Sequence, residues 1–103
     1  MRTVMVRYQV RPDAAAENER LIQQVFAQLA REQLSGVRYQ TVKLADGVSF
    51  VHLASHDGEG ANPITQLAAF KEFAGGIRDR CVEPPVPVEV QLVGAYSSMR
   101  SKA

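Results

Sequence analysis

The segment VRYQTVKLADGVSFVHLAS, residues 37–55, says more about the fold than any other part of this chain. It contains two apolar runs rich in β-branched residues, 37–44 and 48–55, on either side of the tripeptide ADG. Asp-Gly between two such runs is a strong hairpin signal, because both residues tolerate the positive φ that a tight turn needs. The segment therefore predicts two adjacent antiparallel strands.

Upstream of this hairpin the sequence predicts a strand followed by a helix. Residues 3–10 alternate in polarity and are dense in β-branched side chains, which favours a strand. Residues 13–33 carry apolar side chains at three- and four-residue spacing, which predicts a helix with Asp13 as its N-cap and Ser35-Gly36 as its stop. The apolar stripe consists of Leu21, Ile22, Val25, Phe26 and Leu29.

Downstream of the hairpin the sequence predicts a second helix and a last strand. Asn62 and Pro63 are typical of an N-cap followed by a first-turn proline, and apolar residues continue at helical spacing to Ile77. The prolines of EPPVP, residues 83–87, are expected to keep the helix from continuing. Residues 86–96 then predict the fourth strand.

The resulting order, β-α-β-β-α-β, predicts an α+β fold of the ferredoxin-like type. In that fold a four-stranded antiparallel sheet carries both helices on one face, and the right-handed crossover rule leaves few other arrangements. The chain has 103 residues, which allows one domain. We expect this domain to cover residues 1–103, ordered over about 3–96, with 97–103 as a frayed tail.

The predicted strands carry apolar side chains on both faces. Val51 and Leu53 oppose Phe50 and His52 within one strand, and Val93 opposes the apolar row of the last strand. An apolar sheet face without helices usually marks an interface, so we expect a symmetric homodimer through that face. Local bulges that shift the phase of the strands are the alternative interpretation.

Composition and charge narrow the classes of partner. Lys and Arg number 12 against 11 Asp and Glu, so we expect no nucleic-acid partner. The first ten residues lack a signal-peptide pattern, and no stretch approaches the length of a membrane helix, so we expect a cytoplasmic protein with no membrane partner. His56, Asp57 and Glu59 lie on one short loop with no second His or Cys at ligand spacing, so we expect no metal site there.

The hairpin DGVSFVHLAS (46–55) and the segment NPITQLAAFKEFAGGIRDRC (62–81) resemble the antibiotic-biosynthesis-monooxygenase superfamily, in particular its small bacterial members. The resemblance covers residues 3–96. It implies a dimeric α+β barrel, in which two ferredoxin-like sheets close into one barrel with the helices outside. Characterised members include cofactor-independent oxygenases of quinols or anthrones and haem-degrading monooxygenases.

The resemblance also bears on cofactors. The haem-degrading members use a histidine on the second helix and a nearby tryptophan, whereas this chain has no tryptophan and no histidine in its predicted second helix. Haem degradation is therefore disfavoured, and we expect no cofactor. The cofactor-independent members use a pocket between sheet and helices, and their residues cannot be matched to this chain one by one.

Five residues are candidates for a site that activates a phenol. His52, in the middle of a central strand, is the candidate catalytic base, because imidazole accepts protons near neutral pH. Tyr8 and Tyr39 could orient a phenolic substrate, and Phe70 and Phe73 could form the walls of a flat aromatic pocket. Each also has an ordinary interpretation, as a hydrogen-bonded core histidine or as core and interface packing.

Two further features near the second helix have alternative interpretations. Arg78-Asp79-Arg80 is either a charged helix terminus or a site for an anion or a cross-dimer ion pair. Cys81 predicts an inert buried thiol, because a helix C-terminus does not favour a thiolate.

Two classes of function remain open. The first is an oxidoreductase: a monooxygenase that oxygenates a small quinol- or anthrone-type aromatic without a cofactor. The second is a homodimer without catalytic activity that binds a small ligand or has a structural role. The two differ in whether the candidate residues line one enclosed cavity.

Overall fold

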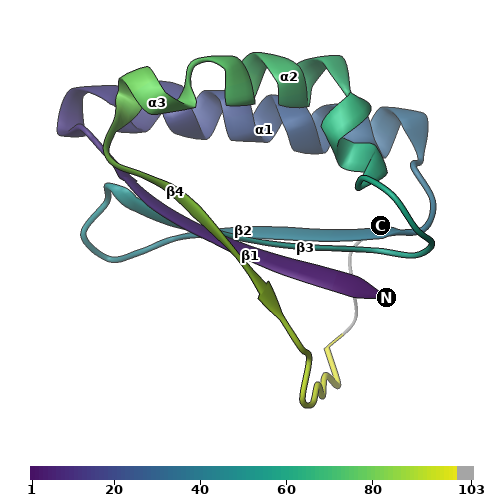
Figure 1. The fold of residues 1–103 in the computed structure, drawn as a ribbon. Coiled ribbons are helices and arrows are strands. Elements are labelled where there is room, and N and C mark those ends of the chain that lie inside the picture. The colour runs from purple at the N-terminus through teal and green to yellow at the C-terminus, as the bar shows by residue number, and fades with distance from the viewer. Residues whose placement is uncertain (100–103) are drawn as a thin grey trace.

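The structure, a computed structural model, describes residues 1–99 (Figure 1). The predicted frayed tail, 97–103, therefore lies partly outside the described residues. The elements, in chain order, are β1 (Arg2–Val10), η1 (Pro12–Ala14), α1 (Ala15–Glu32), β2 (Val37–Lys43), β3 (Ser49–His56), η2 (Pro63–Gln66), α2 (Ala68–Gly75), α3 (Ile77–Arg80) and β4 (Cys81–Val90).

The four strands form one antiparallel sheet in the order β2-β3-β1-β4. The helices lie together on one face of the sheet, and the opposite face carries no helix among the described residues (Figure 1). The predicted α+β, ferredoxin-like architecture is confirmed. Strand β3 is central, and His52 pairs with Val6 of β1 on one side and with Thr41 of β2 on the other.

The turn between β2 and β3 forms as the sequence predicts. The Asp46 carboxylate accepts hydrogen bonds from the Val48 amide (2.9 Å), the Ser49 amide (2.8 Å) and the Ser49 hydroxyl (2.6 Å). The Ser49 hydroxyl and these amides lower the pKa of Asp46. Gly47 has φ +77°, a conformation that glycine adopts without strain. The turn thus fixes the register of the β2–β3 pair.

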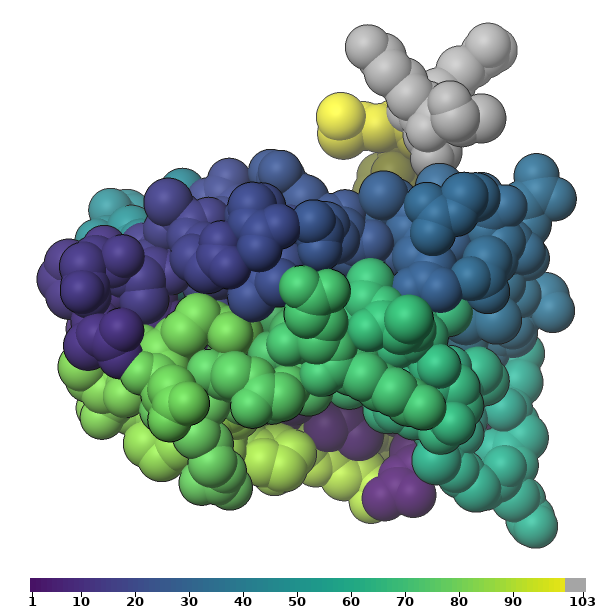
Figure 2. All heavy atoms as spheres, turned by 90° about the horizontal axis from the view of Figure 1, so that it is seen from above, coloured from purple at the N-terminus to yellow at the C-terminus, as the bar shows by residue number. Residues whose placement is uncertain are grey.

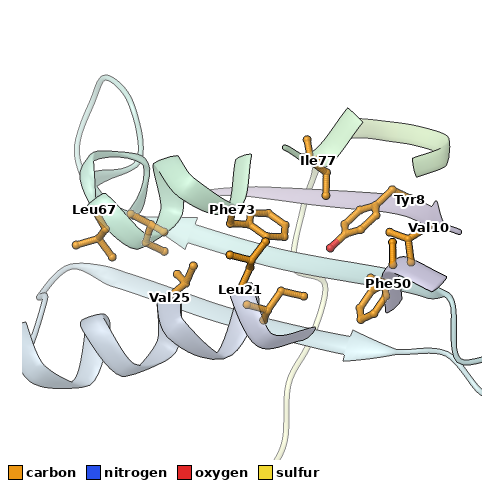
Figure 3. Close-up of a cluster of buried hydrophobic side chains, with 11 residues drawn as sticks. Tyr8, Val10, Leu21, Val25, Phe50, Leu67, Phe73 and Ile77 are labelled. Atoms are coloured by element: carbon orange, nitrogen blue, oxygen red, sulfur yellow. The ribbon is translucent and has the colours of Figure 1, made fainter. Parts of the chain in front are cut away.

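The core fills the layer between the sheet and the helices (Figure 3). Tyr8 of β1 and Phe50 of β3 are opposite each other in the sheet, and their rings stack with centroids 5.6 Å apart. Leu21 and Val25 of α1 and Phe73 of α2 are buried in the same layer. The apolar stripe of the first helix is therefore directed into the core, as its spacing indicates.

The ends of the first helix differ from the prediction. Asp13 is not the N-cap: it lies in η1 and accepts a hydrogen bond from Arg11, and Ala14 takes the cap position without a side-chain bond. Pro12 starts the 3-10 turn and displaces the cap. The helix ends at Glu32, because Gln33 adopts the left-handed conformation (φ 50°) before Ser35-Gly36 is reached.

The second predicted helix is three shorter pieces. Asn62 is the expected cap and accepts from the Ile64 amide at 3.0 Å. Pro63 starts a 3-10 helix, and Leu67 is then extended (ψ 138°) and separates it from α2. Gly76 separates α2 from α3. These interruptions divide the segment above the sheet into three separate helical pieces.

The last strand is also displaced from its predicted position. It spans Cys81–Val90 rather than 86–96, and Pro84 and Pro85, which are expected to precede it, lie within it together with Pro87. A proline cannot donate to a ladder, but β4 is an edge strand, where prolines are tolerated. In this register Val86 pairs with Arg7 and Val88 with Met5 of β1. Because directly paired residues lie on the same face of a sheet, Val86 and Val88 lie on the helix-free face.

Candidate functional site

A cavity of about 350 Å³ lies between the sheet and the segment from η2 to α3. Figure 2 views the molecule from the helical side, and purple atoms of β1 are visible in a recess between the green helices and β4. Sheet residues such as Val4 and Val6 line its floor, and Ile64 and Ile77 line its roof. The lining is mostly apolar, which suits a small hydrophobic ligand.

All five candidate site residues line this one cavity. They are Tyr8, Tyr39, His52, Phe70 and Phe73. They come from four different elements, β1, β2, β3 and α2. The structure thus brings together side chains that are up to 65 positions apart in the sequence, from Tyr8 to Phe73.

His52 lies between two tyrosine hydroxyls. Its Nε2 is 2.7 Å from the Tyr8 hydroxyl, and its Nδ1 is 2.5 Å from the Tyr39 hydroxyl. The Thr41 hydroxyl is a second, longer partner of Nδ1 at 3.1 Å. His52 is 5% exposed, so it reaches a ligand mainly through these hydroxyls.

A polar chain continues from Tyr8 into the helical layer. The Asn18 amide nitrogen donates to the Tyr8 hydroxyl at 2.9 Å, and Arg80 Nε donates to Asn18 Oδ1 at 3.0 Å. Arg80 Nη2 donates to the Phe73 carbonyl at 2.8 Å, and its guanidinium lies 5.3 Å from the centre of the Phe73 ring. Asn18 is fully buried and Arg80 is 8% exposed.

Sequence reasoning missed Asn18, Thr41 and Arg80 as members of this cluster. A signal for Asn18 was present, because it precedes Leu21 by three positions and lies on the apolar stripe. A polar residue on such a stripe is buried only with partners. For Arg80 the charged-terminus interpretation is wrong, because its side chain turns inward under α2.

Burial sets the protonation state of the centre. Desolvation lowers the pKa of His52 to about 4, so its ring is neutral at pH 7. Burial raises the pKa of Tyr39 to about 12, partly offset by a hydrogen bond with Thr41. Burial also raises the pKa of Tyr8. At neutral pH the three groups are therefore uncharged.

Aromatic rings form one wall of the cavity. The Phe73 ring centre is 5.4 Å from the His52 ring and 6.0 Å from the Phe70 ring. Tyr39 stacks on Phe26 of α1 at 4.9 Å, which holds its hydroxyl beside His52. These contacts provide a flat apolar surface next to the hydroxyl groups.

The remaining sequence candidates lie elsewhere or have ordinary roles. His56 is buried at the far end of the cavity, where its Nε2 donates to the Gly60 carbonyl at 3.0 Å. Among residues 1–99, no three His, Cys, Asp or Glu side chains gather in a metal-binding group. Cys81 is half-buried in β4, and burial raises the pKa of its thiol.

The arrangement of sheet and helices is shared with a known class of proteins: the fold is that of the antibiotic-biosynthesis-monooxygenase-like proteins. The resemblance stated from the sequence is thus confirmed at the level of the fold. No family model matches the sequence, and no curated protein matches it. No helix in residues 1–99 combines the length and apolar character needed to cross a membrane.

Three solved structures illustrate the similarity. A candidate antibiotic biosynthesis monooxygenase of Nitrosomonas europaea is 20% identical with a TM-score of 0.76, over 91% of this chain and 100% of that chain. Rv0793 of Mycobacterium tuberculosis is 18% identical with a TM-score of 0.71, over 93% and 98%. SnoaB of Streptomyces nogalater, a cofactor-independent oxygenase whose structure is that of a mutant, is 22% identical with a TM-score of 0.66, over 91% and 94%.

Proposed function

We propose that this protein oxygenates a small electron-rich phenol, of the quinol or anthrone type, without a cofactor. The convergence of Tyr8, Tyr39 and His52 beside the Phe70 and Phe73 rings in one apolar cavity carries the proposal. The structural similarity to a cofactor-independent oxygenase supports the same class of reaction.

The chemistry requires an ionised substrate, a dry cavity and dioxygen. An ionised phenol can reduce O₂ directly, so the substrate supplies all four electrons. One oxygen atom becomes a new carbonyl oxygen, and the other leaves as water with the hydrogens of the oxidised C–H and O–H groups. In this proposal the tyrosine–histidine centre contacts the phenolic oxygen, and the Phe70–Phe73 wall contacts the ring.

The test is oxygen uptake with a panel of hydroquinones and anthrones, with EDTA present and no added cofactor. We expect uptake above the uncatalysed rate and one ¹⁸O atom in the product from ¹⁸O₂. His52→Gln should lower the rate at least tenfold. His56→Gln, at the far end of the same cavity, is the matched control and should retain most of it.

One observation favours a second candidate function, a ligand-binding protein without catalytic activity. Both ring nitrogens of His52 are hydrogen-bonded, and its pKa of about 4 makes it a weak base. A protein that binds these phenols in the cavity and shows no oxygen uptake with any of them would have this function.

We also propose that the working form is a homodimer joined through the helix-free sheet face. That face presents Met5, Val51, Leu53, Val86 and Val88, and the two last are 60% and 46% exposed. The prolines of β4 leave few donors on that edge, which disfavours growth of the sheet by edge pairing. A second copy packed face to face would cover this apolar surface.

A further inference from the structure

We infer that Arg80 and Asn18 orient the polar chain so that every hydrogen bond donates toward the cavity, and that the site therefore binds the oxyanion form of its phenolic ligand. This inference rests on the proposed function, because it concerns the same cavity. It assigns the two buried residues as positioning residues and names the ionisation state of the ligand.

The direction of the chain starts at Arg80, which can only donate. Its Nε therefore faces the carbonyl oxygen of Asn18, and the Asn18 amide nitrogen faces Tyr8. The Tyr8 oxygen must accept from Asn18. The one proton of the Tyr8 hydroxyl then has a single acceptor within reach, Nε2 of His52.

The tautomer of His52 follows from this order. A neutral imidazole has one donor and one acceptor nitrogen. Since Nε2 accepts from Tyr8, the ring proton is on Nδ1 and is donated to the Tyr39 oxygen, its closer partner at 2.5 Å. The Thr41 hydroxyl also bonds the Tyr39 oxygen, and a bond that lowers the pKa of Tyr39 is one in which Thr41 donates. In that arrangement the Tyr39 hydroxyl proton is left for an acceptor in the cavity. A chain of donors headed by a buried cation is polarised, which strengthens the last bond to a negatively charged oxygen.

The charges around the cavity agree with an anionic ligand. Among residues 1–99 no Asp or Glu lines the cavity, whereas Arg2 does. Arg2 lies at the exposed end of the cavity, where its Nε forms an ion pair with the Glu89 carboxylate at 3.4 Å. The titratable or charged groups on or directly behind the cavity are Arg2, Tyr8, Tyr39, His52, His56, Arg80 and Cys81.

The same order of bonds argues against His52 as the base that takes the substrate proton. An added proton on Nε2 would displace the Tyr8 hydroxyl proton, which has no other acceptor because Asn18 donates. The phenol therefore loses its proton to solvent as it enters, and the site stabilises the product of that ionisation. In this inference His52 is a link between Tyr8 and Tyr39, which differs from the role of base expected from the sequence.

The test uses 4-nitrophenol as the probe, because its phenol and phenolate forms absorb at different wavelengths. We expect the wild type to lower the apparent pKa of bound 4-nitrophenol by about one unit or more. This shift means that the protein binds the nitrophenolate anion at least tenfold more tightly than neutral nitrophenol. Long-range ¹H–¹⁵N NMR should show His52 protonated on Nδ1. The spectrum is simple, because the chain contains two histidines.

Asn18→Asp should reverse the direction of the hydrogen bond between Tyr8 and His52, with a side chain of nearly the same shape as that of asparagine. The carboxylate accepts from both Arg80 and Tyr8, so the Tyr8 oxygen becomes free to accept from His52. We expect the His52 proton to move to Nε2 and the preference for the nitrophenolate anion to disappear. Asn62→Asp is the matched control, because it adds the same charge on the cavity lining outside the chain and should leave the His52 tautomer unchanged.

Wild-type protein with His52 protonated on Nε2, or with neutral nitrophenol bound more tightly than the anion, would overturn the inference without any variant. The proposed function fails separately. Preferential binding of the anion without oxygen uptake from any quinol overturns the oxygenase and leaves the inference standing. Oxygen uptake by a protein whose His52 is protonated on Nε2 overturns the inference and leaves the proposed oxygenase standing.

Discussion

The burial of His52 predicts that the folded protein loses stability as the pH falls from about 6.5 to about 4. In the unfolded chain this histidine has its ordinary pKa of 6.5, whereas in the folded chain desolvation lowers the pKa to about 4. Between these values the unfolded state binds a proton that the folded state does not. The free energy of unfolding is therefore highest above pH 6.5 and falls on acidification.

The size of the loss follows from the two pKa values. Each unit of difference corresponds to about 1.4 kcal/mol, so His52 accounts for a loss of about 3 kcal/mol over the full window. This is a large share of the roughly 5–15 kcal/mol by which a domain is stable. The loss should level off below about pH 4, where both states are protonated at this site.

The measurement is urea denaturation followed by circular dichroism at half-unit steps from pH 8 to pH 4, at one protein concentration. His52→Gln should remove most of the pH dependence of the free energy of unfolding between pH 6.5 and 4. His56→Gln should retain the portion of this pH dependence that His52 causes. Equal slopes in the wild type and His52→Gln would show that His52 is not held neutral by burial, and the reasoning about the site would fail.

Three further predictions concern the site, the sheet face and the hairpin. Tyr8→Phe removes the oxygen that joins two buried groups and should lower the free energy of unfolding by about 2–4 kcal/mol; Tyr96→Phe, at a side chain 91% exposed, should change it by less than about 0.5 kcal/mol. Val88→Glu places a charge on the apolar sheet face and should convert a species of twice the monomer mass into monomer in sedimentation velocity; a wild type that is already monomeric would refute the dimer. Gly47→Ala should destabilise the protein by about 1 kcal/mol in urea denaturation, because φ is +77° there. Gly75→Ala, in α2 with open space at its Cβ, should be neutral or stabilising, and a larger loss there than at Gly47 would contradict the backbone argument.

Local sequence patterns do not predict where the last strand and the second helix begin and end. The sequence predicts the last strand at 86–96, after prolines that are expected to end the second helix, whereas the structure has it at Cys81–Val90. Proline is excluded from a strand by its missing donor, and whether that donor is needed depends on whether the strand lies at an edge. Whether a strand lies at an edge depends on the order of the strands in the sheet, which the residues of that strand do not specify. The same holds for Leu67 and Gly76, where the packing of α2 on the core decides the breaks in the second helix.

The candidate site divides in a similar way. His52, Tyr8, Tyr39 and the two phenylalanines could be selected from residue type and position on predicted strands and helices. Their convergence on one cavity could not, since it depends on the relative placement of four elements. For Arg80 the sequence leaves open a charged helix end and a site for an anion or an ion pair, because its position in the chain says nothing of the direction in which its side chain turns.

The order of strands and helices and the β2–β3 hairpin could be read from local sequence, because they depend on alternation, helical spacing and the turn chemistry of Asp46-Gly47. The polarity of the site could not, and it follows from tertiary contacts. A buried chain of hydrogen bonds has a direction only when its members meet, and the donor-only guanidinium of Arg80 meets Asn18 across 62 positions of sequence. That contact sets which nitrogen of His52 carries the proton and what the cavity offers to a ligand.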